Sequence, residues 1–165
     1  MEQQHGMLIV VGVDGSAAGD HALAWALDIA HRTGGSVEVV TAWTAAARAV
    51  AGAPAESLTE SGRAERVQRD SVERALSELA PAPVVAMRVV EGDSGPVLVE
   101  AARRADLLVI GSHGHRRSYN LLMGSTSEYC LRRAQCPVVV IPVPVHDPRA
   151  QHEAVVRANR SRQDA

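Results

Sequence analysis

The chain has 165 residues, the length of one domain, and 46% of them are hydrophobic, which is enough to bury a core of small aliphatic side chains. All 17 basic residues are Arg because the sequence contains no Lys, and this excludes a Lys-containing phosphate loop and Schiff-base catalysis. The formal net charge of −2 gives no electrostatic reason to expect a nucleic-acid partner or an acidic membrane surface.

The first half of the chain predicts two strands, each followed by a helix. Residues 7–13 are a short, β-branched apolar run that predicts a buried strand, and residues 16–33 have helical spacing that stops at two glycines. Residues 37–43 predict the second strand. The Ala, Gly, Pro and Ser content of residues 44–61 is typical of a surface loop. Helical spacing then resumes over 67–79 and ends before two prolines.

The second half predicts three more strands. Residues 84–90 and 107–110 are apolar and flank a helix expected over 97–104, which follows the start signal of a serine and a proline. After a polar, glycine-bearing segment, residues 124–127 resemble the start of a fourth helix. A proline then precedes the fifth strand, expected from Val138 to Val143.

This alternation of strands and helices predicts the fold class. Several of the strands are continuous apolar runs, which is typical of a parallel sheet covered on both faces. We therefore expect a single α/β domain over residues 1–143, doubly wound and of flavodoxin size. We expect residues 144–165 to form a polar tail with four Arg outside the core, with a short helix through Val156 and disorder over 160–165.

The cysteines and the apolar runs indicate the compartment. Cys130 and Cys136 are too few for a disulfide framework and lack CxxC spacing, which favours a reducing cytosol. No apolar run approaches the ~20 residues of a membrane span, and no basic segment precedes the first apolar run. We expect a cytoplasmic chain with no membrane partner.

Two loops carry binding chemistry. In open α/β sheets the ligand crevice lies beyond the carboxyl ends of the strands, where the strand order reverses. The segment from Gly12 to Ser16, with Asp14, follows the first strand, and the segment from Gly111 to Gly114 follows the fourth. Both loops face one cleft if these two strands are neighbours.

The second loop has features of a phosphate site. Gly111, Gly114 and Gly124 permit close approach of backbone N–H groups, and the helix that begins near Gly124 offers unpaired N–H donors to an anion. Arg116 and Arg117 lie within the loop. The alternatives are that the hydroxyl residues after Gly124 only cap the helix, that the glycines only turn the chain, and that the Arg pair is solvated.

These residues carry a family resemblance. The segment GSHGHRRSYNLLMGSTS, followed by AQCPVVVIP, resembles the G-2x-G-9x-G-[S/T] nucleotide loop of the universal stress protein family. The start LIVVGVDGS resembles the first strand of that family and its acidic residue. The match covers residues 7–143. It implies a flavodoxin-like sheet of order 3-2-1-4-5 and, in the loop-bearing branch of the family, ATP binding.

The resemblance also implies site residues. It places Asp14 on the ribose and metal side of ATP, with Mg²⁺, and the backbone of Ala42 against adenine. The remaining residues implied to bind the nucleotide lie in the loops after the first and fourth strands and at the last helix start: Gly12, Ile110, Gly111, His113, Gly114, Gly124, Ser125, Thr126 and Ser127. The chain departs from the family at Arg116 and Arg117, where small residues are common, and at His113 or His115, where Arg is common.

Some of these residues are also compatible with other chemistry. Asp14 could serve as a phosphoacceptor, but the acidic cluster and Lys of receiver domains are missing, or it could be a turn or N-cap carboxylate. His113 and His115 have no third metal ligand nearby and are expected to be loop histidines. We expect both cysteines to be buried small hydrophobes, and no GxSxG elbow supports a Ser nucleophile.

The sequence therefore predicts a cytosolic, homodimeric, ATP-binding regulator in stress response with at most slow hydrolysis. An apolar strand from Val138 to Val143 at the sheet edge would pair with its copy in a second subunit, as the resemblance also implies, unless the tail covers it. The alternatives are a dimeric signalling module that binds no nucleotide and an enzyme of the adenosine-nucleotide α-hydrolase type. No nucleic-acid partner is expected.

Overall fold

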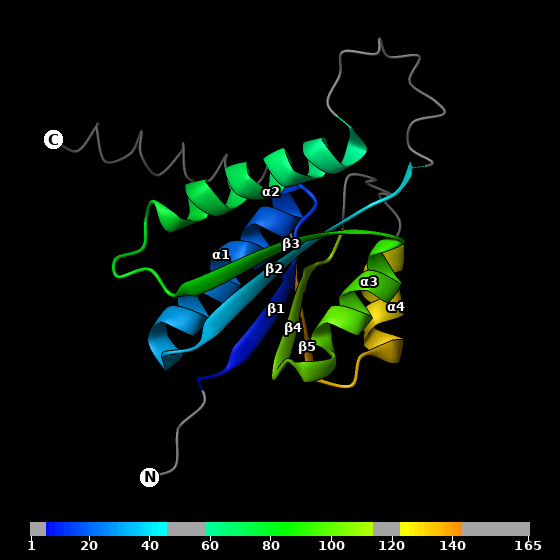
Figure 1. The fold of residues 1–165 in the computed structure, drawn as a ribbon. Coiled ribbons are helices and arrows are strands. Elements are labelled where there is room, and N and C mark those ends of the chain that lie inside the picture. The colour runs from blue at the N-terminus through cyan, green and yellow to red at the C-terminus, as the bar shows by residue number, and fades with distance from the viewer. Residues whose placement is uncertain (1–5, 46–58, 114–122, 143–165) are drawn as a thin grey trace, which may run out of the picture.

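Five parallel strands form one sheet in the order β3-β2-β1-β4-β5 (Figure 1). The computed structural model describes residues 6–45, 59–113 and 123–142. The strands are β1 Leu8–Gly12, β2 Ser36–Trp43, β3 Val84–Glu91, β4 Leu107–Gly111 and β5 Val138–Ile141. The doubly wound, flavodoxin-like sheet of order 3-2-1-4-5 is confirmed, and the order reverses between β1 and β4, as the site prediction requires.

Helices cover both faces of the sheet (Figure 1). α1 Ala17–Thr33 and α2 Glu60–Leu76 lie together on one face, and α3 Ser94–Ala101 and α4 Ser125–Arg133 lie together on the other. A short 3-10 turn, Ala102–Arg104, continues α3. Because the strands are parallel, the N-terminus of each helix lies at the carboxyl edge of the sheet.

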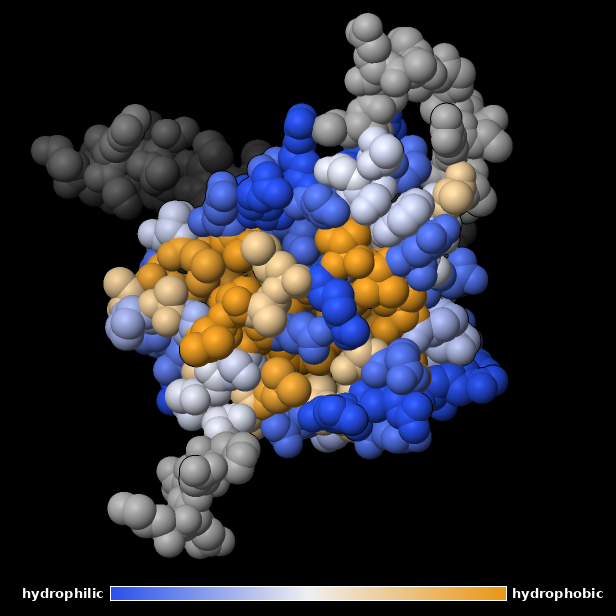
Figure 2. Space-filling model, viewed as in Figure 1, coloured by the Kyte–Doolittle hydropathy of each residue, from blue (hydrophilic) through white to orange (hydrophobic). Residues whose placement is uncertain are grey.

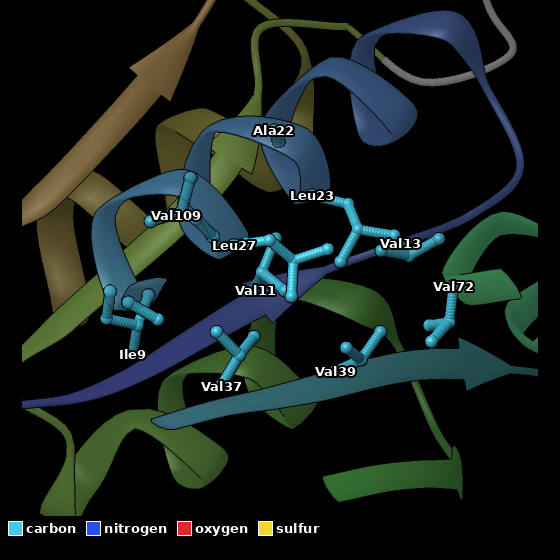
Figure 3. Packing of buried hydrophobic residues seen from close by; sticks show 12 residues of the cluster. Ile9, Val11, Val13, Ala22, Leu23, Leu27, Val37, Val39, Val72 and Val109 are labelled. Atoms are coloured by element: carbon cyan, nitrogen blue, oxygen red, sulfur yellow. The ribbon is translucent and has the colours of Figure 1, made fainter. Parts of the chain in front are cut away.

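The core beneath α1 is made of aliphatic side chains from the strands β1, β2 and β4 and the helices α1 and α2, together with Val13 of the β1–α1 turn (Figure 3). Alternate residues of β1 and β2, including Ile9, Val11 and Val37, meet Leu23 and Leu27 of α1, and all five are fully buried. These helical residues recur with the spacing of one helix face, which explains why the sequence predicted this helix. The packing fixes α1 and its N-terminus over β1 and β4.

A second apolar cluster lies beneath α3 and α4. Val10, Leu108 and Cys130 are fully buried there, and Leu98 is 5% exposed. Burial, with a smaller contribution from the neighbouring Cys136, raises the pKa of the Cys130 thiol to about 11. Cys130 is therefore a buried small hydrophobe, as expected, whereas the expectation of burial is wrong for Cys136, which is half-buried.

Several element boundaries differ from the predicted ones. α2 begins at Glu60, capped by Thr59, inside the expected loop 44–61, because its first two turns are polar and show no apolar spacing. The same helix ends at Leu76, before Leu79. β5 ends at Ile141, so the prediction that the strand includes Pro142 is wrong. Val143, the predicted strand end, and the tail 144–165 lie outside the described residues.

The surface along the β3 edge is partly apolar (Figure 2). Val84 is 74% exposed and Met87 is 52% exposed, and an ion pair of 2.8 Å between Arg88 Nε and Glu38 Oε1 lies among them. Charged side chains at an edge strand disfavour pairing with another sheet. Within the part of the chain that the structure describes, no helix is long and apolar enough to cross a membrane.

Candidate functional site

A cavity of about 380 Å³ opens at the carboxyl ends of β1, β2 and β4. The cavity is lined by residues of the β1–α1 turn, the end of β2, the first two turns of α3, the end of β4 and the start of α4. Every predicted site residue within the described part of the chain lines this cavity. The lining residues are Gly12, Val13, Asp14, Ser16, Gly19, Val40, Ala42, Ser94, Leu98, Ile110, Gly111, His113, Met123, Gly124, Ser125, Thr126 and Ser127.

The β1–α1 turn holds an exposed carboxylate at the cavity. Asp14 Oδ1 accepts hydrogen bonds from the Ser16 backbone N–H at 2.9 Å and from Ser16 Oγ at 2.5 Å. Ser16 Oγ accepts in turn from the Gly19 N–H at 3.2 Å and caps α1. The N-cap is therefore Ser16 and not Asp14, and Asp14 is a turn carboxylate that also lines the cavity.

The end of β2 offers backbone groups at the cavity. The pairing of β1 with β2 ends at Gly12 and Val40, and the Val13 N–H donates to the Val40 carbonyl at 3.0 Å. Alternate residues of a strand direct their backbone groups to the same side, so Ala42, like Val40, directs its N–H and C=O to the β1 side of β2. These two groups lie beyond the last residue pair of β1 and β2. Ala42 therefore presents one donor and one acceptor near the cavity.

The first turn of α4 is bonded to the end of β4. The Gly124 N–H donates to the Ser112 carbonyl at 2.8 Å, and Ser127 Oγ donates to the Gly111 carbonyl at 2.9 Å. Gly124 occupies the N-cap position, and no side chain caps this helix, so the alternative that Ser125 is the cap is wrong. The hydroxyls of Ser125 and Thr126 form no hydrogen bond among the described residues.

The glycines of the site have two different roles. A Cβ at Gly12 would lie 2.8 Å from Leu98 Cδ1, and a Cβ at Gly111 would lie 2.6 Å from the Ala18 Cβ, so helix packing requires both glycines. Gly124 has a φ of −80°, and a Cβ there would meet its nearest atom at 3.5 Å. Neither conformation nor packing requires glycine at 124, which leaves close approach of a ligand as a reason for it.

Side-chain charge and helix dipoles both act in the cavity. Among the described lining residues the titratable side chains are Asp14 and His113. The N-termini of α1, α3 and α4 all reach the cavity, and helix N-termini favour anions. Gly114, His115, Arg116 and Arg117 lie outside the described residues.

His113 and Ser112 form a contact that does not make a catalytic pair. His113 Nδ1 lies 3.1 Å from Ser112 Oγ. Ser112 is 6% exposed and does not line the cavity, whereas His113 does. A nucleophile must reach the substrate, so this serine is unsuited to attack a ligand in the cavity.

The donor set suits a metal that arrives with a phosphate ligand. Within residues 6–45, 59–113 and 123–142 no group of three or more His, Cys, Asp or Glu could hold a metal ion. Mg²⁺ commonly binds through one or two carboxylates together with substrate phosphates. Asp14 offers one such carboxylate, so the residues fit Mg²⁺ only as part of a nucleotide complex.

Sequence reasoning missed the residues that α3 contributes. Ser94 and Leu98 are four positions apart and line the cavity together. The spacing i, i+4 was visible in the sequence, but the face of α3 that turns to the cavity depends on its packing against β1 and β2. Val13, Ser16, Gly19, Val40 and Met123 were not predicted either.

Comparisons with known proteins agree with this architecture. Residues 7–142 match the model of the universal stress protein family. The universal stress protein Rv2624c of Mycobacterium tuberculosis H37Rv is 29% identical over 148 residues, which cover 90% of this chain and 53% of that protein. A universal stress protein of Mycolicibacterium smegmatis is 31% identical over 81% of this chain and 45% of its own length. The chain thus spans about half the length of the curated relatives it matches.

Solved structures of similar fold include two close in size to this domain. The universal stress protein UspA from Lactobacillus plantarum superposes with a TM-score of 0.67 at 21% identity and covers 84% of this chain and 99% of its own. A universal stress protein in complex with cAMP gives a TM-score of 0.62 at 28% identity and covers 84% and 98% of the two chains.

Proposed function

Because this chain belongs to the universal stress protein family, we propose that it binds ATP in the cavity at the β1–β4 switch point and acts as a cytosolic, nucleotide-dependent regulator in stress response. The bound cAMP of a family member 28% identical to this chain supports an adenine-nucleotide ligand. The domain of this function is residues 1–143, and the tail 144–165 is outside it.

One observation carries the proposal: the start of α4 at the cavity. Ser125 and Thr126 offer hydroxyls that form no hydrogen bond among the described residues, and Gly124 is a glycine that neither conformation nor packing requires. Backbone N–H groups at a helix N-terminus, together with hydroxyl donors, bind phosphate well. Ser127 contributes its backbone only, because its hydroxyl proton is used by Gly111.

The aliphatic part of the cavity lining suits the base. Val40, Leu98 and Ile110 are nearly fully buried, and their aliphatic side chains form an apolar surface for a purine ring. The donor and acceptor of the Ala42 backbone would bind the polar edge of adenine. Asp14 would lie on the ribose and metal side, and Mg²⁺ would be held by this carboxylate and the phosphates.

The same residues favour holding ATP over rapid cleavage. Fast phosphoryl transfer needs a positioned base or water and cationic groups that stabilise the transition state. The chain has no Lys, and the titratable side chains among the described lining residues are one Asp and one His. We expect turnover below about one per minute, whereas typical enzymes reach ~1–10³ per second.

Calorimetric titration of the nucleotide-stripped chain with ATP, with and without Mg²⁺, tests the proposal. The double variant Gly124→Val with Ser125→Ala should abolish binding, because both changes alter the phosphate end. Ser61→Ala is the matched control, since Ser61 lies in the first turn of α2 and does not line the cavity. Absence of heat up to millimolar ATP with the unaltered chain would leave the nucleotide-free signalling module as the better hypothesis.

We also propose that two copies pair through β5 as a homodimer. β5 is an edge strand, and all four of its residues are half-buried. Trp25 and Ile29 of α1 pack against the same core cluster as Val139 and Ile141 of β5. α1 contacts β5, and α4 also contacts this strand. An apolar edge strand of this kind is stabilised by a partner strand.

Sedimentation measurements test the dimer. Val139→Glu should shift the chain to a monomer, because the carboxylate would be buried at the shared edge. Val84→Glu, at the opposite edge strand β3, is the matched control and should leave the mass unchanged. A wild-type chain that sediments as a monomer at micromolar concentration would contradict this proposal.

A further inference from the structure

One face of α3 lines the cavity. Ser94 is the first residue of this helix and Leu98 lies four positions later, so both side chains occupy the same helix face. Leu98 packs so closely on β1 that a Cβ at Gly12 would lie 2.8 Å from it. This contact fixes the rotation of α3 and directs Ser94 to the space above the sheet edge, where it lines the cavity.

The turn before α3 is also bonded to β2. The Gly92 N–H donates to the Trp43 carbonyl at 2.8 Å, and Ala42 is paired in register with Val90. Ser94 therefore follows two residues after a backbone bond to the strand end that carries Ala42. Its position relative to the Ala42 backbone is set by secondary structure at both sides, and such rigid placement suits a recognition residue.

The Ser94 hydroxyl is not used by the protein. It forms no hydrogen bond among the described residues, and the N-cap residue of α3 is Asp93, so Ser94 is not the cap. The same cavity is lined by the aliphatic side chains of Val40, Leu98 and Ile110. Ser94 is thus an exposed hydroxyl side chain that lines the cavity from α3, whereas Ser125 and Thr126 line it from the start of α4.

We propose that Ser94 Oγ hydrogen-bonds N7 or the 6-amino nitrogen of the bound purine and thereby contributes to the choice of base. The proposal rests on nucleotide binding in this cavity. Ala42 supplies one donor and one acceptor to one edge of adenine, and Ser94 can donate or accept at a second position of the ring. A neutral hydrogen bond of this kind changes affinity about two- to tenfold.

The test compares four forms of the full chain by calorimetric titration: wild type, Ser94→Ala, Ser94→Thr and Ser125→Ala. The probes are ATP, purine riboside triphosphate, which lacks the 6-amino group, and 7-deaza-ATP, which lacks N7. Ser94→Ala should weaken ATP binding about two- to tenfold and remove the preference for ATP over at least one analogue. Ser94→Thr retains the hydroxyl and should keep both.

Ser125→Ala separates base recognition from general loss of affinity, because it should weaken all three probes by the same factor. Unchanged ATP affinity in Ser94→Ala, or an unchanged preference for ATP over both analogues, would overturn the role of Ser94 while nucleotide binding stands. A wild-type chain that binds none of the three probes would overturn the proposed function and, with it, this inference.

Discussion

The hydroxyl of Ser127 donates a hydrogen bond to the carbonyl oxygen of Gly111 over 2.9 Å, and this bond joins the first turn of α4 to the end of β4. Ser127 is 2% exposed, so Ser127→Ala would leave a carbonyl near the cavity without this donor. We expect the free energy of unfolding to fall by about 1–3 kcal/mol. Urea denaturation measures this change.

Ser125→Ala is the control for that effect, because Ser125 is exposed and its hydroxyl forms no hydrogen bond among the described residues. Its free energy of unfolding should change by less than about 0.5 kcal/mol, while its ATP affinity should fall. If the two variants lost the same stability, the distinction between a structural and a ligand-facing hydroxyl would be wrong.

Gly124→Ser should separate stability from binding. Serine is at least as good an N-cap as glycine, and a Cβ at this position has ordinary van der Waals room, so stability should hold or rise by a few tenths of a kcal/mol. ATP affinity should nevertheless fall, because the added side chain occupies space at the phosphate end. Thermal unfolding and calorimetric titration of the same sample measure both quantities, and unchanged affinity would speak against the assignment of Gly124.

Gly12→Ala should lower the free energy of unfolding. The new Cβ would lie 2.8 Å from Leu98 Cδ1, and overpacking of this kind costs about 1–3 kcal/mol. Adding Leu98→Val shortens the opposing side chain and should recover part of the loss, which urea denaturation of the single and double variants would show. Purely additive losses would mean that the contact between these two residues is not the cause.

The order of strands and helices along the chain could be predicted because the strands are continuous apolar runs and α1 has a clear apolar face, whereas the strand order in the sheet was implied by the family resemblance. The start of α2 was missed because the residues from Glu60 onward are charged or small, and helix capping by Thr59 leaves no apolar periodicity. The resemblance placed Gly12 and Gly111 at the ligand, and they do line the cavity. Helix packing requires the same two glycines. The sequence cannot distinguish this requirement from close approach of a ligand, because both favour glycine at the same position.

The contribution of α3 shows a second limit. Ser94 is an ordinary serine near a helix start, and its relevance depends on the rotation of α3, which the contact of Leu98 with Gly12 determines. Tertiary packing of this kind is not encoded in local periodicity. The loop residues Gly114, Arg116 and Arg117 lie outside the described residues, so their part in the site stays a prediction.

Stability should decrease at alkaline pH through Cys130. Burial raises the pKa of this thiol from its ordinary value of about 9 to about 11 in the fold. Between these values the unfolded chain releases the proton and the folded chain keeps it, so the stabilisation is complete below about pH 9 and is lost as the pH rises to about 11. The chain has no Lys, and Cys136 is the other thiol whose pKa is raised by burial. Urea denaturation at intervals from pH 8 to 11 should show a downward slope that is reduced in Cys130→Ala, whereas an equal slope in that variant would assign the effect to the other groups.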